Sequence, residues 1–286
     1  MKIIRAEHLG MCFGVRDAIA LAVTESRRQP VTILGDLVHN PVVIRELRQK
    51  GVQIEHELAS VSTPVVMITA HGASESAKTR IRSQGHQVIE ATCPLVHVAH
   101  AALHQLVKDG FYPVIIGKRD HVEVRGMTGD LTHHDVILSE EDILTLEEHP
   151  KIGIVAQTTQ PVDKVRRLVQ LVRERFPRSE IRFKDTVCQP TKQRQAAAVE
   201  LATKCDVVVV VGGHQSNNTR ELVETCRRHC RRVEQVESAH ELKQEWFRDA
   251  ETVGLTAGTS TPDSTIEAVE GAIRAMSPNH TLASAS

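Results

Sequence analysis

Three cysteines divide the chain into near-equal parts, and each lies where a turn leads into a predicted helix. They are Cys12 in Met11-Cys-Phe-Gly-Val15, Cys93 in Ala91-Thr-Cys-Pro-Leu95 and Cys188 in Asp185-Thr-Val-Cys-Gln-Pro190. Cysteine thiolates are the usual ligands of iron–sulfur clusters, and three on a four-iron cluster would leave one iron open to a substrate. One thiolate from each of three similar units therefore predicts a shared metal centre on a pseudo-threefold axis. The alternative is three unrelated small core residues, because such long spacings are weaker evidence than a paired Cys-x-x-Cys motif.

Strand and helix patterns alternate along almost the whole chain, which favours an α/β fold with parallel sheets. Aromatic residues make up only 2% of the chain, so the core depends on Val, Ile, Leu and Ala. Continuous aliphatic runs are typical of parallel strands buried on both faces. We expect strands at Val31–Leu34, Val65–Thr69, Val114–Ile116, Ile152–Ala156, Val207–Val211 and Thr252–Thr256.

Two helices have readable ends. The first follows Asn40, a good capping residue, has Pro41 at its first position and is ended by Gly51. The second runs from about Pro262 to Met276. No sequence repeat is visible, so any threefold symmetry would be structural only.

Charge and hydropathy argue against two classes of partner. The formal net charge is −1, which gives no global electrostatic signal for nucleic acid or a membrane surface. The absence of a leader and of a run of about 18 apolar residues predicts a cytoplasmic protein.

Cysteines in the cytoplasm are more often metal ligands or buried thiols than disulfides. We expect Cys205 to pack against a strand, and Cys226 and Cys230 to form a plain helix face, with a metal site including His229 as the alternative.

Two glycine-containing loops have the form of anion sites. The loop Gly212-Gly-His-Gln-Ser-Asn-Asn-Thr-Arg220 joins a buried strand to a helix, where unpaired N–H groups and the helix dipole attract anions. Its side-chain donors are Ser216, Asn217 and Asn218. A second such loop, Thr256-Ala-Gly-Thr-Ser-Thr-Pro-Asp263, contains Ser260. Two loops of this kind indicate a phosphorylated ligand such as a diphosphate, although ordinary helix capping explains either loop alone.

Histidines in short turn-like strings are the third signal. His39, His71 and His121 lie in Val38-His-Asn-Pro41, Ala70-His-Gly-Ala73 and Asp120-His-Val-Glu123. Imidazoles can donate to phosphate oxygens, but each of these has a structural role as its alternative. A second group, His97, His100 and His104, shares one helix face, which we interpret as solvated, with a metal site as the alternative.

Glu123 is the candidate acid. In an extended segment His121 and Glu123 would point to the same side, and a carboxylic acid beside a histidine can relay a proton. The alternative is a glutamate on a surface strand. Thr158, in Gln157-Thr-Thr159, follows a predicted strand and supplies a hydroxyl where α/β proteins usually bind ligands.

Together these residues resemble the 4-hydroxy-3-methylbut-2-enyl diphosphate reductase family, which acts last in the methylerythritol phosphate route to isoprenoids. The resemblance covers nearly the whole chain, from about Cys12 to Asp263. It is carried by nine motifs in order: Cys-Phe-Gly-Val, Val-His-Asn, Ala-His-Gly, Ala-Thr-Cys-Pro-Leu-Val, His-x-Glu-Val-x-Gly, Gln-Thr-Thr, Val-Cys with a following Arg-Gln, Ser-x-Asn and Thr-Ala-Gly-x-Ser-x-Pro-Asp.

The resemblance implies a fold and a set of lobes. The fold is three similar α/β lobes in a pseudo-threefold trefoil around a central iron–sulfur cluster. We expect lobes at residues 10–92, 93–187 and 188–276, with residues 1–9 packing on the third and a loose tail at 277–286. The activity implied is the reductive dehydroxylation of (E)-4-hydroxy-3-methylbut-2-enyl diphosphate to isopentenyl and dimethylallyl diphosphate, with ferredoxin or flavodoxin as electron donor.

The resemblance also implies roles for individual residues. Cys12, Cys93 and Cys188 would hold one [4Fe–4S] cluster with one open iron. Glu123, Thr158 and His121 would form the catalytic set. The substrate would be bound by His39, His71, His121, Thr158, Ser216, Asn217, Asn218 and Ser260.

The chain departs from the family pattern at several positions. Val122 stands where the family usually has proline, Asp120 replaces a glycine, Met11 replaces a more usual phenylalanine, and Asn217 stands where a small residue is common. An alternative from another class is therefore an iron–sulfur paralogue that is non-catalytic or has an altered substrate, acting as a redox sensor or diphosphate-binding protein. The intact Glu123, Thr158 and diphosphate set favour the reductase, because a sensor has no need of them.

Overall fold

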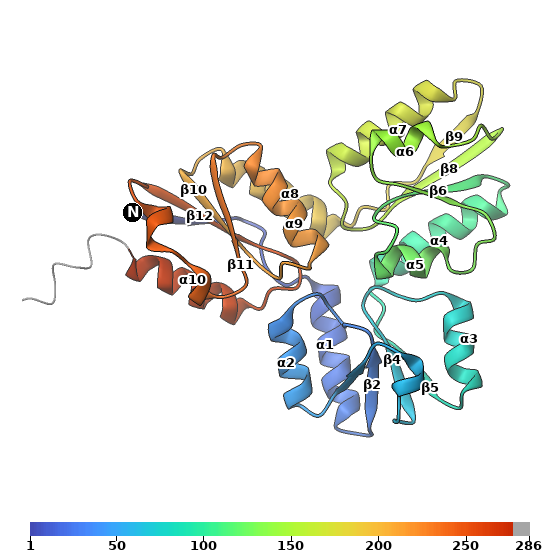
Figure 1. Cartoon of the computed structure of the whole chain (residues 1–286), viewed down its shortest axis with the longest axis horizontal. Helices are drawn as coiled ribbons and strands as arrows, with labels where there is room; N and C mark the ends of the chain where they lie inside the picture. Colours follow the sequence, from blue (N-terminus) through green and yellow to red (C-terminus); the bar gives the residue numbers. More distant parts are fainter. Residues whose placement is uncertain (277–286) are drawn as a thin grey trace, which may run out of the picture. The chain divides into compact units, whose positions relative to one another are not determined.

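The alternating pattern folds into three four-stranded parallel sheets in the computed structural model, which describes residues 1–276 (Figure 1). The predicted tail at 277–286 lies outside the described residues. Contacts divide the chain into two compact units. Unit 1 comprises Met1–Cys12, His39–Val43 and Gln189–Ser286, and unit 2 comprises Phe13–Val38 and Ile44–Cys188. The expected α/β class is confirmed, whereas the lobe boundaries stay a prediction.

Unit 1 contains a sheet in the order β1-β12-β10-β11. Its strands are β1 (Lys2–Arg5), β10 (Val207–Val211), β11 (Arg232–Val236) and β12 (Thr252–Ala257), and its helices are α8 (Gln189–Ala202), α9 (Asn217–Arg227) and α10 (Asp263–Ala275). Valines alternate along β10: Val208 and Val210 pack in the core beside α8 and α9, while Val207, Val209 and Val211 pack with α10. Both faces of this sheet are thus covered (Figure 1), and the loops that follow β10 and β12 leave from the same edge.

Unit 2 contains two sheets. The first has the order β3-β2-β4-β5. Its strands are β2 (Val31–Leu34), β3 (Gln53–Glu55), β4 (Val65–Ile68) and β5 (Gln87–Glu90). Beside these strands in sequence are the helices α1 (Phe13–Ser26), α2 (Pro41–Gln49), which begins in unit 1, and α3 (Glu75–Ser83). As expected, Asn40 caps α2 by accepting hydrogen bonds from the N–H groups of Val42 and Val43 at 3.0 and 3.4 Å.

The second sheet of unit 2 has the order β7-β6-β8-β9. Its strands are β6 (Tyr112–Ile116), β7 (Asp135–Ile137), β8 (Lys151–Ala156) and β9 (Glu180–Phe183), and its helices are α4 (Pro94–Lys108), α5 (Val122–Thr128), α6 (Glu140–Leu144) and α7 (Val162–Arg175). One face packs against α7, while α4 and α5 cover the other. A Cβ on Gly153 would meet Leu106 Cβ of α4 at 3.0 Å, so this glycine lets α4 lie close to β8.

Candidate active site

Glu123 and Thr158 form a buried acid–hydroxyl pair in unit 2. The Thr158 N–H donates to Glu123 Oε1 at 2.6 Å, and the Thr158 hydroxyl donates to Oε2 at 2.9 Å. The two residues are 2% and 4% exposed. Burial raises the pKa of Glu123 to about 7, although the two hydrogen bonds from Thr158 act in the opposite direction. A carboxyl group that titrates near neutrality is suited to proton transfer at physiological pH.

The structure corrects the local geometry expected for Glu123. The residue does not lie in an extended segment but in the first turn of α5, whose N-cap is His121. The N–H of Glu123 donates to His121 Nδ1 at 3.2 Å, which leaves Nε2 of the neutral ring as a donor. The alternative of a surface strand is wrong as well, because Glu123 is helical and buried.

Gln157 holds the loop that contains Thr158. Its Oε1 accepts from the Lys118 N–H at 3.1 Å and from Gln160 Nε2 at 3.1 Å. A Cβ on Gly117 would lie 2.9 Å from Gln157 Cβ, so only a glycine gives the side chain this space. The carboxyl ends of β6 and β8 are thus joined beneath the acid–hydroxyl pair.

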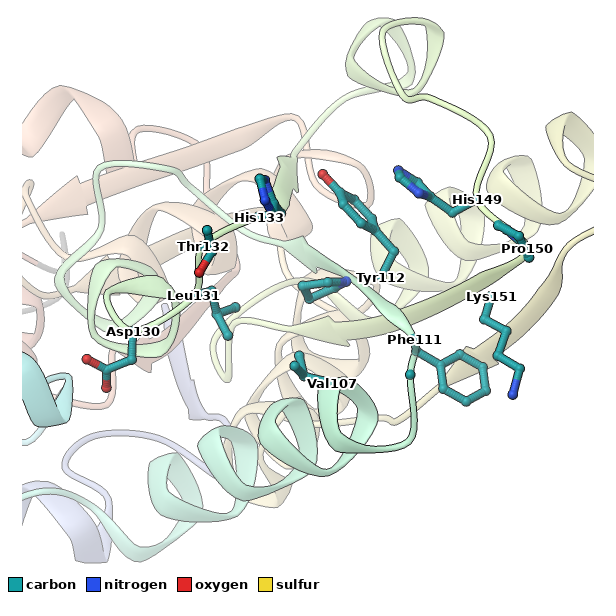
Figure 2. Close-up of a pocket in the computed structure, with 12 residues that line it drawn as sticks. Val107, Phe111, Tyr112, Asp130, Leu131, Thr132, His133, His149, Pro150 and Lys151 are labelled. Carbon is teal, nitrogen blue, oxygen red and sulfur yellow. The ribbon is translucent and has the colours of Figure 1, made fainter.

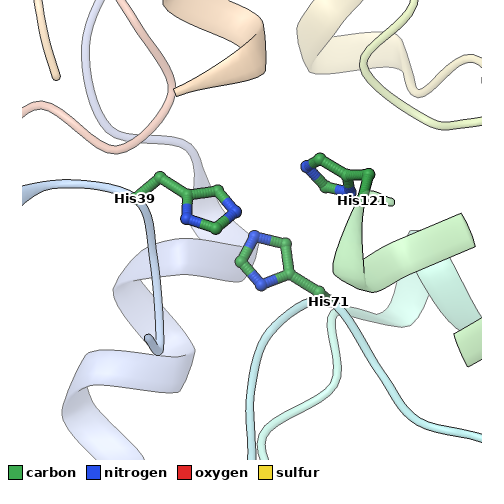
Figure 3. A group of neighbouring side chains, drawn as sticks. All are labelled: His39, His71 and His121. Carbon is green, nitrogen blue, oxygen red and sulfur yellow. The ribbon is translucent and has the colours of Figure 1, made fainter. Parts of the chain in front are cut away.

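His71 and His121 lie together in unit 2, while their role in binding a phosphate group stays a prediction. Figure 3 shows the two rings edge to face, with centroids 5.4 Å apart and an interplanar angle of 87°. Gly126 brings their segments together, because a Cβ there would meet the Gly72 carbonyl oxygen at 3.3 Å. His71 follows β4 and His121 begins α5, so two lobes supply these rings.

Cys93 and Cys188 occupy turns of the predicted kind in unit 2. Cys93 is the N-cap of α4, with Pro94 next to it, and its N–H donates to the Ala70 carbonyl at 3.0 Å. Its thiol packs against α1, where a Cβ on Gly14 would lie 2.4 Å from Cys93 Sγ. The N–H of Cys188 donates to the Thr158 carbonyl at 2.9 Å, so this turn is joined directly to the acid–hydroxyl pair. Both side chains are half-buried.

Cys12 is half-buried in unit 1 and lies beside the second predicted anion loop. Its N–H donates to the Thr259 carbonyl at 3.1 Å, and the N–H of Gly10 donates to the Ala257 carbonyl at 3.0 Å. The Thr259 N–H in turn donates to Asn218 Oδ1 at 2.9 Å. The two anion loops and the Cys12 segment therefore form one hydrogen-bonded group.

The anion loops of unit 1 contain buried donors that have no partner. Ser216 is the N-cap of α9, and its Oγ accepts from the Thr219 N–H at 3.3 Å. The Nδ2 group of Asn218 and the hydroxyl of Ser260 are buried without a hydrogen-bond partner, and their residues are 3% and 5% exposed. Because an unsatisfied buried donor costs about 1–3 kcal/mol, such groups call for an external acceptor.

His39 and Asn217 are also placed at these loops. A Cβ on Gly213 would lie 2.6 Å from the His39 carbonyl oxygen, so the Gly213 backbone passes directly against the His39 segment. Asn217 begins α9 and is 7% exposed. Unit 1 thus brings together the segments of His39, Ser216, Asn217, Asn218 and Ser260.

The three other cysteines pack in or against the core, as expected for Cys205. The helix face expected for Cys226 and Cys230 is wrong, because α9 ends at Arg227 and Cys230 lies beyond it. Cys226 and Cys230 belong to the core between α8, α9 and β10, and Cys205 packs against it. Burial raises the pKa of Cys226 to about 12 and that of Cys205 to about 11, which disfavours the thiolate form that metals bind.

The interpretation of His97, His100 and His104 as a solvated face is only partly right. His97 and His104 are exposed on α4, but His100 is half-buried and its Nε2 has no hydrogen-bond partner. Burial lowers the pKa of His100 to about 4, so its ring is neutral at pH 7.

A hollow of about 610 Å³ lies at the amino ends of the strands of the β7-β6-β8-β9 sheet, away from the acid–hydroxyl pair (Figure 2). Tyr112 and Lys151, the first residues of β6 and β8, line it, and the Tyr112 ring stacks on His149 at a centroid distance of 3.6 Å. None of the predicted site residues lines this hollow. Ligands of open α/β sheets bind at the carboxyl ends of strands, so we do not assign it to the active site.

Sequence reasoning gave no role to Arg194, Thr259 and Gln157, although the structure connects each to a predicted site residue or its loop. Arg194 and Gln157 lie within the Arg-Gln and Gln-Thr-Thr motifs, so a signal existed. Thr259 acts through its backbone, for which no side-chain pattern exists.

Comparison with known proteins places the chain in a family. The model of the LytB protein family matches residues 3–274. The 4-hydroxy-3-methylbut-2-enyl diphosphate reductase of Aquifex aeolicus is 36% identical over 96% of both chains. That of Trichlorobacter lovleyi is 34% identical over 98% of this chain and 100% of the relative.

Two solved structures are similar along nearly the whole chain. The E-1-hydroxy-2-methyl-but-2-enyl-4-diphosphate reductase of Plasmodium falciparum has a TM-score of 0.86 and 28% identity, covering 93% of this chain and 85% of that one. A structure of (E)-4-hydroxy-3-methyl-but-2-enyl diphosphate reductase, the terminal enzyme of the non-mevalonate pathway, has a TM-score of 0.69 and 35% identity, covering 96% and 99%.

Within residues 1–276, no helix is both long and apolar enough to cross a membrane. The match of one family model from near the first residue to near the last, together with relatives similar over almost their full lengths, confirms the resemblance drawn from the nine motifs: the chain belongs to the LytB protein family.

Proposed function

We propose that this protein is an oxidoreductase that converts (E)-4-hydroxy-3-methylbut-2-enyl diphosphate to isopentenyl and dimethylallyl diphosphate. The relatives that carry this activity in their names match the chain over nearly its whole length. The observation that carries the proposal for this chain is the Glu123–Thr158 pair, because removal of a hydroxyl as water requires a proton donor held at that hydroxyl.

We propose one [4Fe–4S] cluster held by Cys12, Cys93 and Cys188, with one iron left open. Family membership implies iron–sulfur chemistry, and the thiols of these residues are the donor set that such a cluster takes. The environment fits, since Gly14 leaves the space beside Cys93 Sγ that a Cβ would fill. When bound, the cluster would provide a Lewis-acid iron and would pass on, one at a time, the two electrons that the external donor supplies.

The diphosphate would be held by hydrogen-bond donors rather than by lysine or arginine. In unit 1 the unpartnered donors of Asn218 and Ser260 would bind phosphate oxygens. The cap Ser216, the first-turn Asn217 and His39 would contribute to the same site. In unit 2 the rings of His71 and His121 would serve the same group. Binding energy at the diphosphate would orient the remote C–O bond for reaction.

Glu123 would be the proton source and Thr158 the group that contacts the substrate hydroxyl. With Glu123 protonated, its O–H would donate to Thr158 Oγ1, and the Thr158 hydroxyl would donate onward to the leaving oxygen. The pKa of about 7 keeps a protonated fraction at physiological pH. The N–H of Thr158 would then keep the resulting carboxylate in place.

We also propose a ferredoxin or flavodoxin as electron donor and a cytoplasmic location. Both are proposed from membership of the family. The test is anaerobic purification with measurement of iron and sulfide, followed by turnover with a chemical reductant. Failure of folded, cluster-containing protein to turn over would favour the non-catalytic paralogue.

A further inference from the structure

Arg194 on α8 hydrogen-bonds both to the segment before Cys12 and to the first turn of its own helix. It is 7% exposed, and its Nε and Nη2 donate to the Gly10 carbonyl oxygen at 3.0 and 2.7 Å. Its Nη1 donates to the Pro190 carbonyl at 3.0 Å. The planar guanidinium fixes the direction of all three donors at once, which a lysine cannot do. One buried side chain thus fastens the turn before Cys12 to the turn that follows Cys188.

The Gly10 carbonyl points to Arg194 because of a backbone conformation that requires glycine. Gly10 has φ +73°, and a Cβ there would meet Ile266 Cδ1 at 2.7 Å. The N–H of the same residue is bonded to the Ala257 carbonyl, and the N–H of Cys12 to that of Thr259. The segment from Gly10 to Cys12 therefore has two backbone anchors on the β12 side, and the Arg194 side chain anchors it on the α8 side.

Residues that hydrogen-bond to a metal-ligating residue or its backbone orient the ligand atom and raise the affinity of the site for the metal. We propose that Arg194 is a positioning residue for Cys12: by holding the Gly10 carbonyl, it directs the Cys12 thiolate toward the metal centre. The inference rests on the proposed function, in which Cys12 is a cluster ligand. Arg194 acts here through the backbone and contacts neither the substrate nor the reacting atoms.

The test compares Arg194→Met and Arg194→Lys with the control Arg227→Met, whose exposed guanidinium at the end of α9 pairs with Glu224. Each protein is purified anaerobically, and iron release to a strong Fe(II) chelator is followed. We expect release from Arg194→Met to be about tenfold faster than from wild type, as for other residues behind metal ligands. Arg194→Lys can reach one carbonyl at a time, so its rate of iron release should fall between those of wild type and Arg194→Met. We also expect its reduced cluster to have an altered electron paramagnetic resonance spectrum.

A double-mutant cycle separates positioning from general destabilisation. Cys12→Ser removes the ligand that Arg194 is proposed to direct, so adding Arg194→Met should not accelerate iron release further. Additive effects would mean that Arg194 acts on the fold as a whole, which would overturn the proposal. If Arg194→Met yields no folded protein, Arg194→Lys takes its place in the cycle, and a lysine variant with wild-type release and spectrum overturns it equally.

A second measurement does not depend on the cluster. In metal-free protein, alkylation of Cys12 by iodoacetamide is followed by peptide mass spectrometry, with Cys226 as the buried internal reference. Loss of Arg194 should change the alkylation rate of Cys12 by about threefold or more while leaving Cys226 unreactive. An unchanged rate would overturn the inference even in an active enzyme. A changed rate in protein that never binds iron would instead count against the proposed function alone.

Discussion

Among the single residues of the site, Glu123 has a carboxyl group whose environment favours the protonated form. Glu123 is surrounded by core residues and receives hydrogen bonds from a single residue, Thr158, among the contacts described within residues 1–276. Two donors to the carboxylate lower its pKa, but burial outweighs them and leaves the pKa at about 7. This balance between burial and hydrogen bonding gives a pKa that suits a group that must give a proton in each turnover and regain it from water.

Replacing Glu123 by glutamine should remove the acidic proton of the carboxyl group and keep the shape of the side chain. We expect Glu123→Gln to retain the cluster and diphosphate binding, with kcat reduced by about 10²–10⁴-fold, the usual contribution of a general acid. Exposed Glu141 on α6 provides the matched control, because Glu141→Gln makes the same chemical change away from the site. Near-normal turnover of Glu123→Gln would remove this residue from the proton path.

The pH dependence of turnover should report the same group. Because Glu123 must be protonated to donate, kcat should fall as pH rises through about 7, by tenfold per unit well above it. Thr158→Val removes one of the hydrogen bonds that lower this pKa, so the surviving activity should decline at a higher pH than in wild type. A descending limb that stays in place in Thr158→Val would assign it to another group.

The free energy of unfolding should depend on pH through the same carboxyl group, and the direction of the change can be predicted. The pKa of Glu123 is raised in the folded state above its ordinary value of 4.5, so the stability present below that value is lost as pH rises through about 7. Glu123→Gln carries no such charge, and its free energy of unfolding should exceed that of wild type more at pH 8 than at pH 6. Anaerobic denaturant titrations at the two pH values measure the difference, and an equal gap would contradict a raised pKa.

At the element scale, helix starts place the reactive side chains. Cys93, His121 and Ser216 are the N-caps of α4, α5 and α9. An N-cap points its side chain toward the exposed N–H groups of the first turn, where anions are favoured. Parallel sheets bring such helix starts to one edge, which is why a fold of this class can gather thiolates, imidazoles and hydroxyls from distant parts of the sequence.

The close packing of α1 on Cys93 allows a test with one added methyl group. In Gly14→Ala the new Cβ would lie 2.4 Å from Cys93 Sγ, so the thiol must move and bound iron should fall, as it should in Cys93→Ser. The control is Gly271→Ala in α10, where a Cβ meets nothing within 4 Å and helix propensity should add about 0.5–1 kcal/mol of stability. Wild-type iron content in Gly14→Ala would contradict a metal-bound Cys93.

A substitution of Asn218 tests the anion loops, because the oxygen and the NH2 group of its side chain have different roles. In Asn218→Asp an oxygen can still accept from the Thr259 N–H, but the buried donor becomes a negative oxygen. We expect iron content to be unchanged and KM to rise at least about tenfold, because a carboxylate repels a diphosphate. Gln193→Glu on exposed α8 surface adds the same charge as a control. An unaltered KM in Asn218→Asp would exclude Asn218 from substrate binding.

At the scale of the whole molecule, the aliphatic central strands and the nine motifs were enough to predict the class of fold and the family. Strands such as β3 and β7 were not predicted, because three residues at a sheet edge with polar members show no clear period. The helical position of Glu123 was missed, since a histidine cap is a weak signal. Arg194 was given no role although it lies in the Arg-Gln motif, because its partner is a backbone carbonyl 184 residues away, which no side-chain pattern identifies.

Turnover by the intact, anaerobically purified protein is the measurement that decides whether this chain is the reductase. Iron and sulfide are quantified first, and (E)-4-hydroxy-3-methylbut-2-enyl diphosphate is then supplied with a chemical reductant. We expect about four irons per chain, the content of one [4Fe–4S] cluster, and the formation of both isopentenyl and dimethylallyl diphosphate. Folded protein that carries the cluster and forms neither product would contradict it.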